Sequence, residues 1–398
     1  MKFRNYLGLA IASIEWYEAA ICVSLAPVLS SIFFPQLSAF TSFMLYFSSF
    51  AAGYFGRPLG AFLFGTYSDT NSRLKATYFS LCMMIASSVC ISFLPTYIKI
   101  GIWAPVLFSL FKFVQGVALG GNYGVSVFSV ENAHKNERYF AASMISVGFM
   151  IGFLLGGLIV TVFTQIFSKE FLYSIGWRIA IWVSFIISIP VLMQIRGLVK
   201  EEKLNPKKTQ IVELKKDTQQ NSKIDYKLVA KISCILLLDM VPFYMFFVFL
   251  PNYKIMFLNM SSAVWLEQSL SMFVMMVFTP FFGKVADTYG AIRTLKSSAL
   301  VFAALSVFIP WKSFLWNIAF GFSMAICYGC LYGFVSLAFP KNIRARTSSI
   351  IYNIMAIFGA FTPMIATALA RIHIVLTGCF LGLISIAVFI VLTKTEEI

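Results

Sequence analysis

Long apolar segments, separated by short polar ones, run through the whole chain and limit what it can fold into. A helix that crosses a bilayer needs roughly 20 mostly apolar residues. Only 12% of the residues are charged and the mean hydropathy is +0.84, whereas a soluble domain carries about 25% charged residues. The pattern predicts an all-α membrane protein, surrounded by lipid, with twelve transmembrane helices at residues 7–31, 42–66, 77–95, 102–128, 139–166, 177–196, 229–251, 263–283, 294–310, 313–338, 347–369 and 373–393.

The basic residues indicate which side of the membrane each loop faces. The formal net charge is +15. If the N-terminus is cytoplasmic, most Lys and Arg residues fall in cytoplasmic loops, as the positive-inside rule requires. The charge is then explained without a nucleic-acid partner, and we expect both termini to be cytoplasmic. The first span starts almost at the initiator Met and is too long for the apolar region of a signal peptide, so no cleaved leader is expected.

A polar segment and a repeated motif divide the chain into two halves. The sequence FGTYSDTNSRLK at 64–75 and the sequence FGKVADTYGAIR at 282–293 align with a constant shift and share Phe, Gly, Asp and Thr. Repeats related by an axis along the membrane normal are a known transporter architecture. We therefore predict two six-helix halves with pseudo-two-fold symmetry, residues 1–196 and 229–398, joined by a cytoplasmic loop at 197–228.

Five further motifs together resemble those of one protein family. These are EWYE at 15–18, RPLGA at 57–61, KFVQGVALGGNYGVS at 112–126, GWR at 176–178 and FPKNIRART at 339–347. In this combination the chain resembles the major facilitator superfamily, and within it the metabolite:H⁺ symporters, which include proline/betaine and α-ketoglutarate transporters. The chain departs from the usual motifs at Thr70, Ser72, Lys112 and Asn122, and at the Ile11-Ala12 pair.

Ionisable residues inside the predicted spans are candidates for transport chemistry, because such groups are costly in a bilayer and usually mark a pathway or a relay. Those singled out here are Glu15, Glu18, Arg57, Lys112 and Asp239, with Glu131 just beyond the predicted end of the fourth span. A carboxylate in low dielectric is suited to take up and release H⁺ near neutral pH. Glu15, Glu18 and Asp239 are therefore the candidates for proton coupling. The alternative is that Glu15 and Glu18 are structural counter-ions for Arg57 and Lys112.

Four residues are candidates for substrate binding. Lys112 offers a point charge to an anionic group, and Asn122 lies in the same predicted span. Trp16 and Tyr17 would stack on an ammonium group or a ring, although packing in the core is at least as good an explanation for both. A zwitterionic osmolyte such as proline or betaine and a small carboxylate such as α-ketoglutarate both fit this set.

The two signature loops are assigned to gating by the resemblance. It implies that Asp69 faces a helix starting near Thr347 and Ser348, and that Asp287 faces one starting near Glu137 and Arg138. It also implies that the glycines of the fifth span pack against the eighth. The residues assigned to gating or to the signature loops are Arg57, Gly65, Asp69, Arg73, Gly283 and Asp287.

Other classes of function lack support in the sequence. No G-x-x-x-x-G-K-[ST] motif indicates a nucleotide site, and we find no His/Asp cluster or Ser–His arrangement that enzymatic chemistry would need. We therefore expect no enzyme, no metal and no cofactor, with H⁺ as the coupling ion. The predicted function is secondary active transport of a small molecule by a functional monomer in the cell inner membrane. The alternatives are an H⁺-independent uniporter or exchanger, and a sensor or scaffold that has lost transport.

Overall fold

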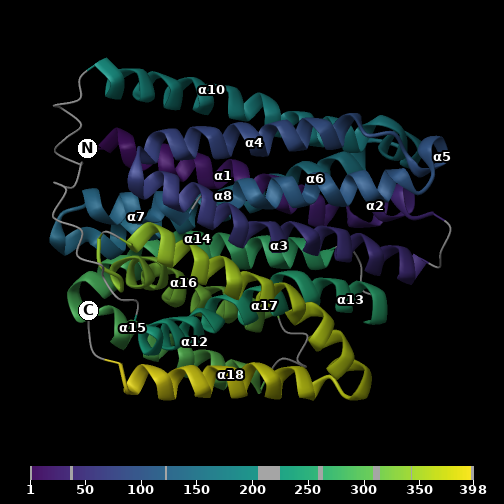
Figure 1. Ribbon diagram of the computed structural model, residues 1–398. Coiled ribbons are helices and arrows are strands. Elements are labelled where there is room, and N and C mark those ends of the chain that lie inside the picture. The colour runs from purple at the N-terminus through teal and green to yellow at the C-terminus, as the bar shows by residue number, and fades with distance from the viewer. Residues whose placement is uncertain are drawn as a thin grey trace. The chain divides into compact units, whose positions relative to one another are not determined.

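The computed structural model describes residues 2–35, 39–121, 123–204, 225–258, 263–307, 314–341 and 343–395. All regular elements within these ranges are helical (Figure 1). In chain order they are α1 (Lys2–Ser24), α2 (Ala26–Phe33), α3 (Ala39–Thr70), α4 (Arg73–Phe93), α5 (Tyr97–Ile100), α6 (Trp103–Gly120), α7 (Tyr123–Asn132), η1 (Lys135–Glu137), α8 (Arg138–Ile166), α9 (Lys169–Phe171), η2 (Leu172–Gly176), α10 (Trp177–Leu204), α12 (Tyr226–Phe243), η3 (Tyr244–Phe249), α13 (Leu250–Leu258), α14 (Ala263–Tyr289), α15 (Ala291–Ser306), α16 (Phe314–Leu337), α17 (Arg344–Ile372) and α18 (Val375–Thr393).

The described helices account for the predicted spans. Nine segments are long and apolar enough to cross a membrane, and the bent pair α1 and α2 is a tenth. That pair bends by 66° where Pro27 lies in the first turn of α2, a position that suits proline because its missing N–H is not needed there. The two other predicted spans correspond to α3, with 32 residues, and α15, with 16 described residues.

The predicted span at 102–128 is wrong as a single helix. Helix α6 ends at Gly120 and α7 begins at Tyr123. Two consecutive glycines, Gly120 and Gly121, stand at the break, and glycine is a poor helix former because it loses more backbone freedom than other residues.

The helices form two compact units, each of which consists mainly of one half of the sequence. The first unit contains Met1–Phe128, Ile151–Lys223 and Pro340–Asn353, and the second contains Ser129–Met150, Ile224–Phe339 and Ile354–Ile398. The first part of α8 therefore belongs to the second unit, and the first part of α17 belongs to the first. The predicted division at 197–228 stays a prediction, because residues 205–224 lie outside the described part.

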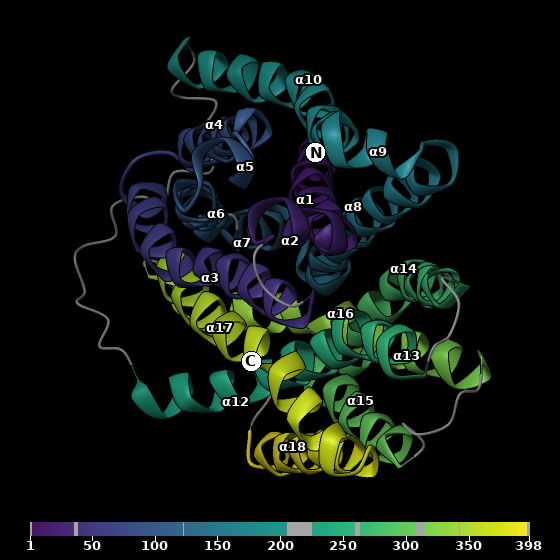
Figure 2. The same cartoon turned by 90° about the vertical axis from the view of Figure 1, so that its right-hand side faces the viewer.

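In the first unit, glycines bring α3 and α6 into backbone contact. A Cβ atom on Gly116 would lie 1.8 Å from the carbonyl oxygen of Gly53, and one on Gly60 would lie 1.8 Å from that of Val117. The two helices lie side by side in both views (Figures 1 and 2). Small residues allow helices in a membrane to approach this closely, so α6 holds its polar side chains at a fixed distance from α3.

Glycines also join α8 to α1 in the first unit. A Cβ atom on Gly152 would lie 2.0 Å from the carbonyl oxygen of Ser13, and one on Gly156 would lie 2.7 Å from that of Tyr17. The partner of these two glycines is therefore the first span, and not the eighth span that the resemblance implied. This contact fixes the helix that carries both glutamates of the EWYE motif.

In the second unit, α14 packs closely on α16. A Cβ atom on Gly321 would lie 2.4 Å from the carbonyl oxygen of Ser271, and α15 packs with α18 beside this pair (Figure 2). Helix α12 contains Pro242 and continues into the π-helical turn η3, whose residues are all buried. A proline inside a helix removes one backbone hydrogen bond, and a π-helical turn is one way to accommodate such an interruption.

Candidate functional site

Four of the predicted ionisable residues meet in the first unit. Glu15 and Glu18 on α1, Arg57 on α3 and Lys112 on α6 all line one cavity of about 30 Å³, which is room for a water molecule or two. Both glutamates are 7% exposed and Lys112 is 4% exposed. Residues three positions apart lie on one face of a helix, and both acids accordingly line the same cavity.

Glu18 is bound by three uncharged side chains from three other helices. Its carboxylate accepts hydrogen bonds from Ser88 of α4, Gln115 of α6 and Ser184 of α10. Ser88 and Ser184 are almost fully buried, and Gln115 is 7% exposed. A carboxylate accepts several hydrogen bonds at once, so this network keeps Glu18 satisfied although the site is shielded from solvent.

Lys112 reaches Glu18 through the Gln115 amide. The Lys112 Nζ atom donates to the Oε1 atom of Gln115 and to the sulfur of Cys22, both at 2.8 Å. The amide nitrogen of Gln115 donates in turn to Glu18 and, at 2.8 Å, to Ser88. The amide therefore separates the opposite charges, and their attraction is not a direct ion pair.

Glu15 has a different environment. Its Oε1 atom is buried and has no hydrogen-bond partner, and the positive charge of Arg57 acts on it. The Arg57 guanidinium lies 4.2 Å from the centre of the Tyr54 ring, an arrangement in which a cation is attracted to the face of the ring. The free oxygen leaves Glu15 able to accept a proton or a hydrogen bond at the cavity.

A second, smaller cavity borders the Glu18 network. Its volume is about 10 Å³, and apolar residues such as Ile91 and Ile181 line it together with Cys22, Glu18, Ser88, Lys112 and Gln115. Glu18, Lys112 and Gln115 line both cavities. These three side chains are therefore shared by two small spaces inside the first unit.

The two aromatic candidates of the EWYE motif do not line either cavity. The Tyr17 hydroxyl donates to the carbonyl oxygen of Ala180 at 3.1 Å, and the residue is 2% exposed within the apolar core. The Trp16 ring lies 6.4 Å from that of Phe153. Their positions match the core-packing explanation that the sequence left open. Asn122 lies outside the described residues.

Asp239 lies in the second unit and is bound by tyrosines. It is 2% exposed and accepts hydrogen bonds from the hydroxyl groups of Tyr328 and, at 3.4 Å, Tyr332. Both tyrosines are on α16, and Asp239 is on α12. Like Glu18, this buried acid is held by uncharged donors.

Among the signature residues, Asp287 has the partner that the resemblance implied. Its two carboxylate oxygens accept hydrogen bonds from the backbone N–H groups of Tyr139 and Phe140, each at 2.9 Å, at the start of α8. Gly283 lies against Phe140 and Ser143 of the same helix. The gating role of Asp287 and Gly283 stays a prediction.

In the first unit, Gly65 lies against the backbone of Arg346 in the first turn of α17, where an added Cβ atom would be 3.2 Å from the Arg346 Cα. The Arg346 guanidinium lies 4.9 Å from the centre of the Phe62 ring. The side chains of Asp69 and Arg73 lie outside the described residues, so the partner of Asp69 stays a prediction.

We expect Asp287→Ala to destabilise the protein by about 2 kcal/mol, because it removes a charged N-terminal partner of α8. Thermal unfolding of the purified protein in detergent measures the change. Glu137→Gln is the matched control, since it removes a nearby exposed charge and leaves both Asp287 hydrogen bonds in place. Equal stability of the Asp287→Ala and Glu137→Gln proteins would contradict this prediction.

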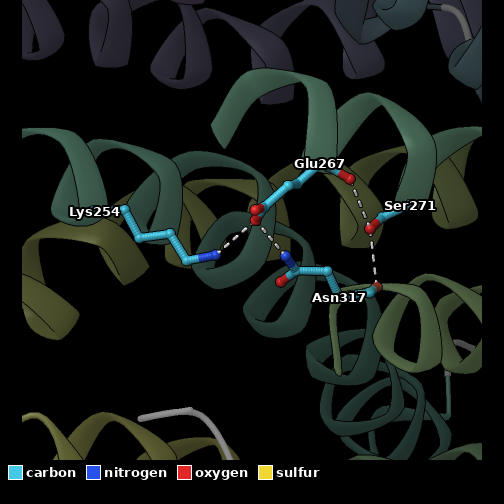
Figure 3. Close-up of polar contacts among 4 residues, drawn as sticks. All are labelled: Lys254, Glu267, Ser271 and Asn317. Carbon is cyan, nitrogen blue, oxygen red and sulfur yellow. Dashed lines mark hydrogen bonds and ion pairs between the residues drawn. The ribbon is translucent and has the colours of Figure 1, made fainter. Parts of the chain in front are cut away.

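The structure adds polar residues that the sequence did not single out. Ser88, Gln115 and Ser184 complete the Glu18 network. In the second unit, Lys254 of α13 pairs with Glu267 of α14 at 3.1 Å, and Asn317 of α16 donates to the same oxygen (Figure 3). Glu267 falls inside a predicted span, so counting every charge within the spans finds it.

Comparison with known proteins agrees with this architecture. The family model of the Major Facilitator Superfamily matches residues 9–363. The proline/betaine transporter of Salmonella typhimurium is 27% identical over 379 residues, covering 90% of this chain and 76% of the relative. The shikimate transporter of Escherichia coli K12 is 27% identical over 374 residues, covering 90% and 85%. A solved structure of the proton:xylose symporter XylE, at 14% identity, has a TM-score of 0.78 and covers 99% of this chain and 95% of that one. The predicted fold class is confirmed.

Proposed function

The chain belongs to the Major Facilitator Superfamily, and on this premise we propose that it is a secondary active transporter that carries a small polar metabolite together with H⁺. The observation that carries the proposal is the buried Glu18 network, in which a carboxylate is held by uncharged donors beside a cavity. Buried acids of this kind in a membrane protein are candidates for proton relays.

The Ser88 hydroxyl allows the network to accept Glu18 in either protonation state. Ser88 donates to Glu18, and its oxygen also lies 3.0 Å from the carbonyl oxygen of Met84. A hydroxyl group donates one hydrogen and accepts others. When Glu18 takes up a proton, Ser88 turns its hydrogen to Met84 and accepts the new O–H. The network then has no unsatisfied polar atom in either state.

The other candidates take distinct roles in this proposal. Lys112 is the partner for an anionic group of a small carboxylate substrate, and Glu15, with its free oxygen at the same cavity, is a second site for the proton. Asp239 is the corresponding acid of the second unit, since its two tyrosine donors are also uncharged. The gating role of Asp287 is proposed from the charge it places at the start of α8.

The relatives support two substrate classes. They are named as transporters of proline and betaine, of shikimate and of alpha-ketoglutarate. We therefore propose a zwitterionic osmolyte or a small carboxylate as substrate. We further propose a functional monomer in the cell inner membrane with both termini in the cytoplasm, which agrees with the distribution of Lys and Arg.

Uptake into proteoliposomes tests the proposal. Labelled proline, betaine and α-ketoglutarate are offered in parallel, with and without an inward-directed H⁺ gradient. We expect one of them to accumulate only when the gradient is present, and to stop accumulating when a protonophore collapses it. Uptake that merely equilibrates and ignores the gradient would favour a uniporter or exchanger. Binding without any uptake would favour the sensor or scaffold.

A further inference from the structure

The polar cluster in the second unit has unmet hydrogen-bonding capacity. Lys254 is 3% exposed and donates to the Oε2 atom of Glu267 at 3.1 Å, and the Asn317 amide nitrogen donates to the same atom at 2.7 Å (Figure 3). The Oδ1 atom of Asn317 and both polar side-chain atoms of Gln268 are buried and have no hydrogen-bond partner. Asn317 is 1% exposed and Gln268 is 4% exposed.

Burying such groups without partners is unfavourable. Each unsatisfied donor or acceptor costs about 1–3 kcal/mol, and apolar side chains of similar size at these positions would avoid that cost. The Glu267 side chain is 25% exposed, so the cluster is open on that side. An open, partly unsatisfied polar cluster is the arrangement expected where a ligand completes the hydrogen bonds.

The packing of α14 on α16 resembles the packing of α3 on α6 beside the cavity of the first unit. Gly116 lies on the carbonyl oxygen of Gly53, and Gly321 lies in the same way on that of Ser271. Ser271 takes the place of Gly53 under the shift that aligns the two signature loops. Asn317 precedes Gly321 by the four positions that separate Lys112 from Gly116.

Gln268 corresponds to Phe50 in the same way, because it precedes Ser271 by three positions and Phe50 precedes Gly53 by three. Phe50 and Lys112 both line the cavity of the first unit. The two amides with unmet hydrogen bonds therefore stand where the first unit places two residues of its cavity wall.

We propose that Glu267, Asn317, Gln268 and Lys254 form a substrate subsite in the second unit for a zwitterionic solute of the amino-acid type. The substrate ammonium replaces Lys254 on Glu267 and donates its remaining N–H to a free amide oxygen, while Lys254 binds the substrate carboxylate. This inference rests on the proposed transport function and selects between its two substrate classes.

The charges of the subsite favour a zwitterion over a carboxylate. Lys254 and Glu267 together carry no net charge, so a bound zwitterion leaves every charge paired. A dicarboxylate would pair with Lys254 and place further negative charge beside the half-buried Glu267, which is unfavourable because like charges repel. A quaternary ammonium has no N–H to donate to Asn317 or Gln268, so betaine fits the subsite less well than proline does.

Two variants separate a subsite from a merely structural ion pair. In the double variant Lys254→Met/Glu267→Gln the pair is removed together, which avoids leaving one charge buried alone. Gln268→Met replaces an unsatisfied amide by an apolar side chain of similar size, which is neutral or stabilising for the fold. The matched control is Asp225→Asn/Lys227→Met, which removes two exposed charges at the start of α12.

The experiment is calorimetric binding of L-proline, glycine betaine and α-ketoglutarate to the purified full-length protein, with thermal stability measured on the same samples. We expect the native and control proteins to bind proline at least ten times more tightly than betaine or α-ketoglutarate. In both test variants we expect proline affinity to fall at least tenfold, about 1.4 kcal/mol, with thermal stability unchanged or higher for Gln268→Met.

If both test variants bind proline as tightly as the native protein does, the subsite proposal is wrong. It is also wrong if the native protein binds α-ketoglutarate in preference to proline. Neither result would contradict the proposed transport. Transport is tested separately, by measuring gradient-driven uptake by the native protein. Conversely, proline binding that depends on Glu267 and Gln268, in a protein without gradient-driven uptake, would retain the subsite and reject the transport proposal.

Discussion

Glu18→Gln is expected to abolish H⁺-driven accumulation of substrate while leaving the protein folded. One H⁺ moved down a gradient of one pH unit supplies about 1.4 kcal/mol, which supports roughly tenfold accumulation when the membrane potential is held at zero. Glutamine keeps the shape of the side chain but has no proton to load or release. The accumulation ratio should therefore fall from about ten to one, with slow equilibration remaining.

The Glu18 network explains why this substitution is expected to act on coupling. The carboxylate accepts from Ser88, Gln115 and Ser184, and a glutamine at the same position still accepts through its own oxygen. The serine hydroxyls turn to accept from the new amide. Proteoliposome uptake with an imposed gradient gives the measurement.

Glu18→Asp is the control for Glu18→Gln, because it retains a titratable group and should retain gradient dependence. A Glu18→Gln protein that still concentrates substrate would show that the proton is carried elsewhere. Glu15 and Asp239 would then be the residues to test next. Glu15 has a free oxygen at the same cavity, and Asp239 is held by tyrosines in the second unit.

The sequence was sufficient for the fold class and for the charged members of the candidate site. Hydropathy alone predicts the spans, because a bilayer requires long apolar segments with their backbone bonds satisfied internally. Glu15, Glu18, Arg57 and Lys112 were predicted because charges are rare in such segments, and all four line one cavity.

The uncharged members of the site could not be predicted from the sequence. Ser88, Gln115 and Ser184 come from three different helices and lie far from Glu18 along the chain. Serine is frequent in these spans, and nothing in the local pattern distinguishes Ser88 from its neighbour Ser87. Only helix packing determines which serine faces an acid.

The cluster in the second unit was missed for a different reason. Glu267 lies inside a predicted span but near its end, and Lys254 lies beyond the predicted end at residue 251. The helices continue past that point, since α13 extends to Leu258. A charge near a span end has two explanations, a solvated boundary and a buried partner, and the tertiary contact between Lys254 and Glu267 decides between them.

Gly116→Ala is expected to cause a large loss of stability. The added Cβ atom would lie 1.8 Å from the carbonyl oxygen of Gly53, so the backbones of α3 and α6 must separate. Overpacking of this kind costs about 3 kcal/mol or more. Because Gly116 and Gly53 also line the cavity that contains Glu18 and Lys112, uptake should be lost with stability.

Gly157→Ala on α8 supplies the comparison for Gly116→Ala. A Cβ atom on Gly157 has no neighbour within 4 Å, so alanine there should be neutral or stabilising by roughly 0.5–1 kcal/mol, as it is in other helix interiors. Heating both proteins in detergent and measuring the fraction that stays monodisperse gives the order of stability. If Gly116→Ala survives heating as well as Gly157→Ala does, α3 and α6 are not in backbone contact. The placement of Lys112 at the cavity wall depends on that contact and is then wrong as well.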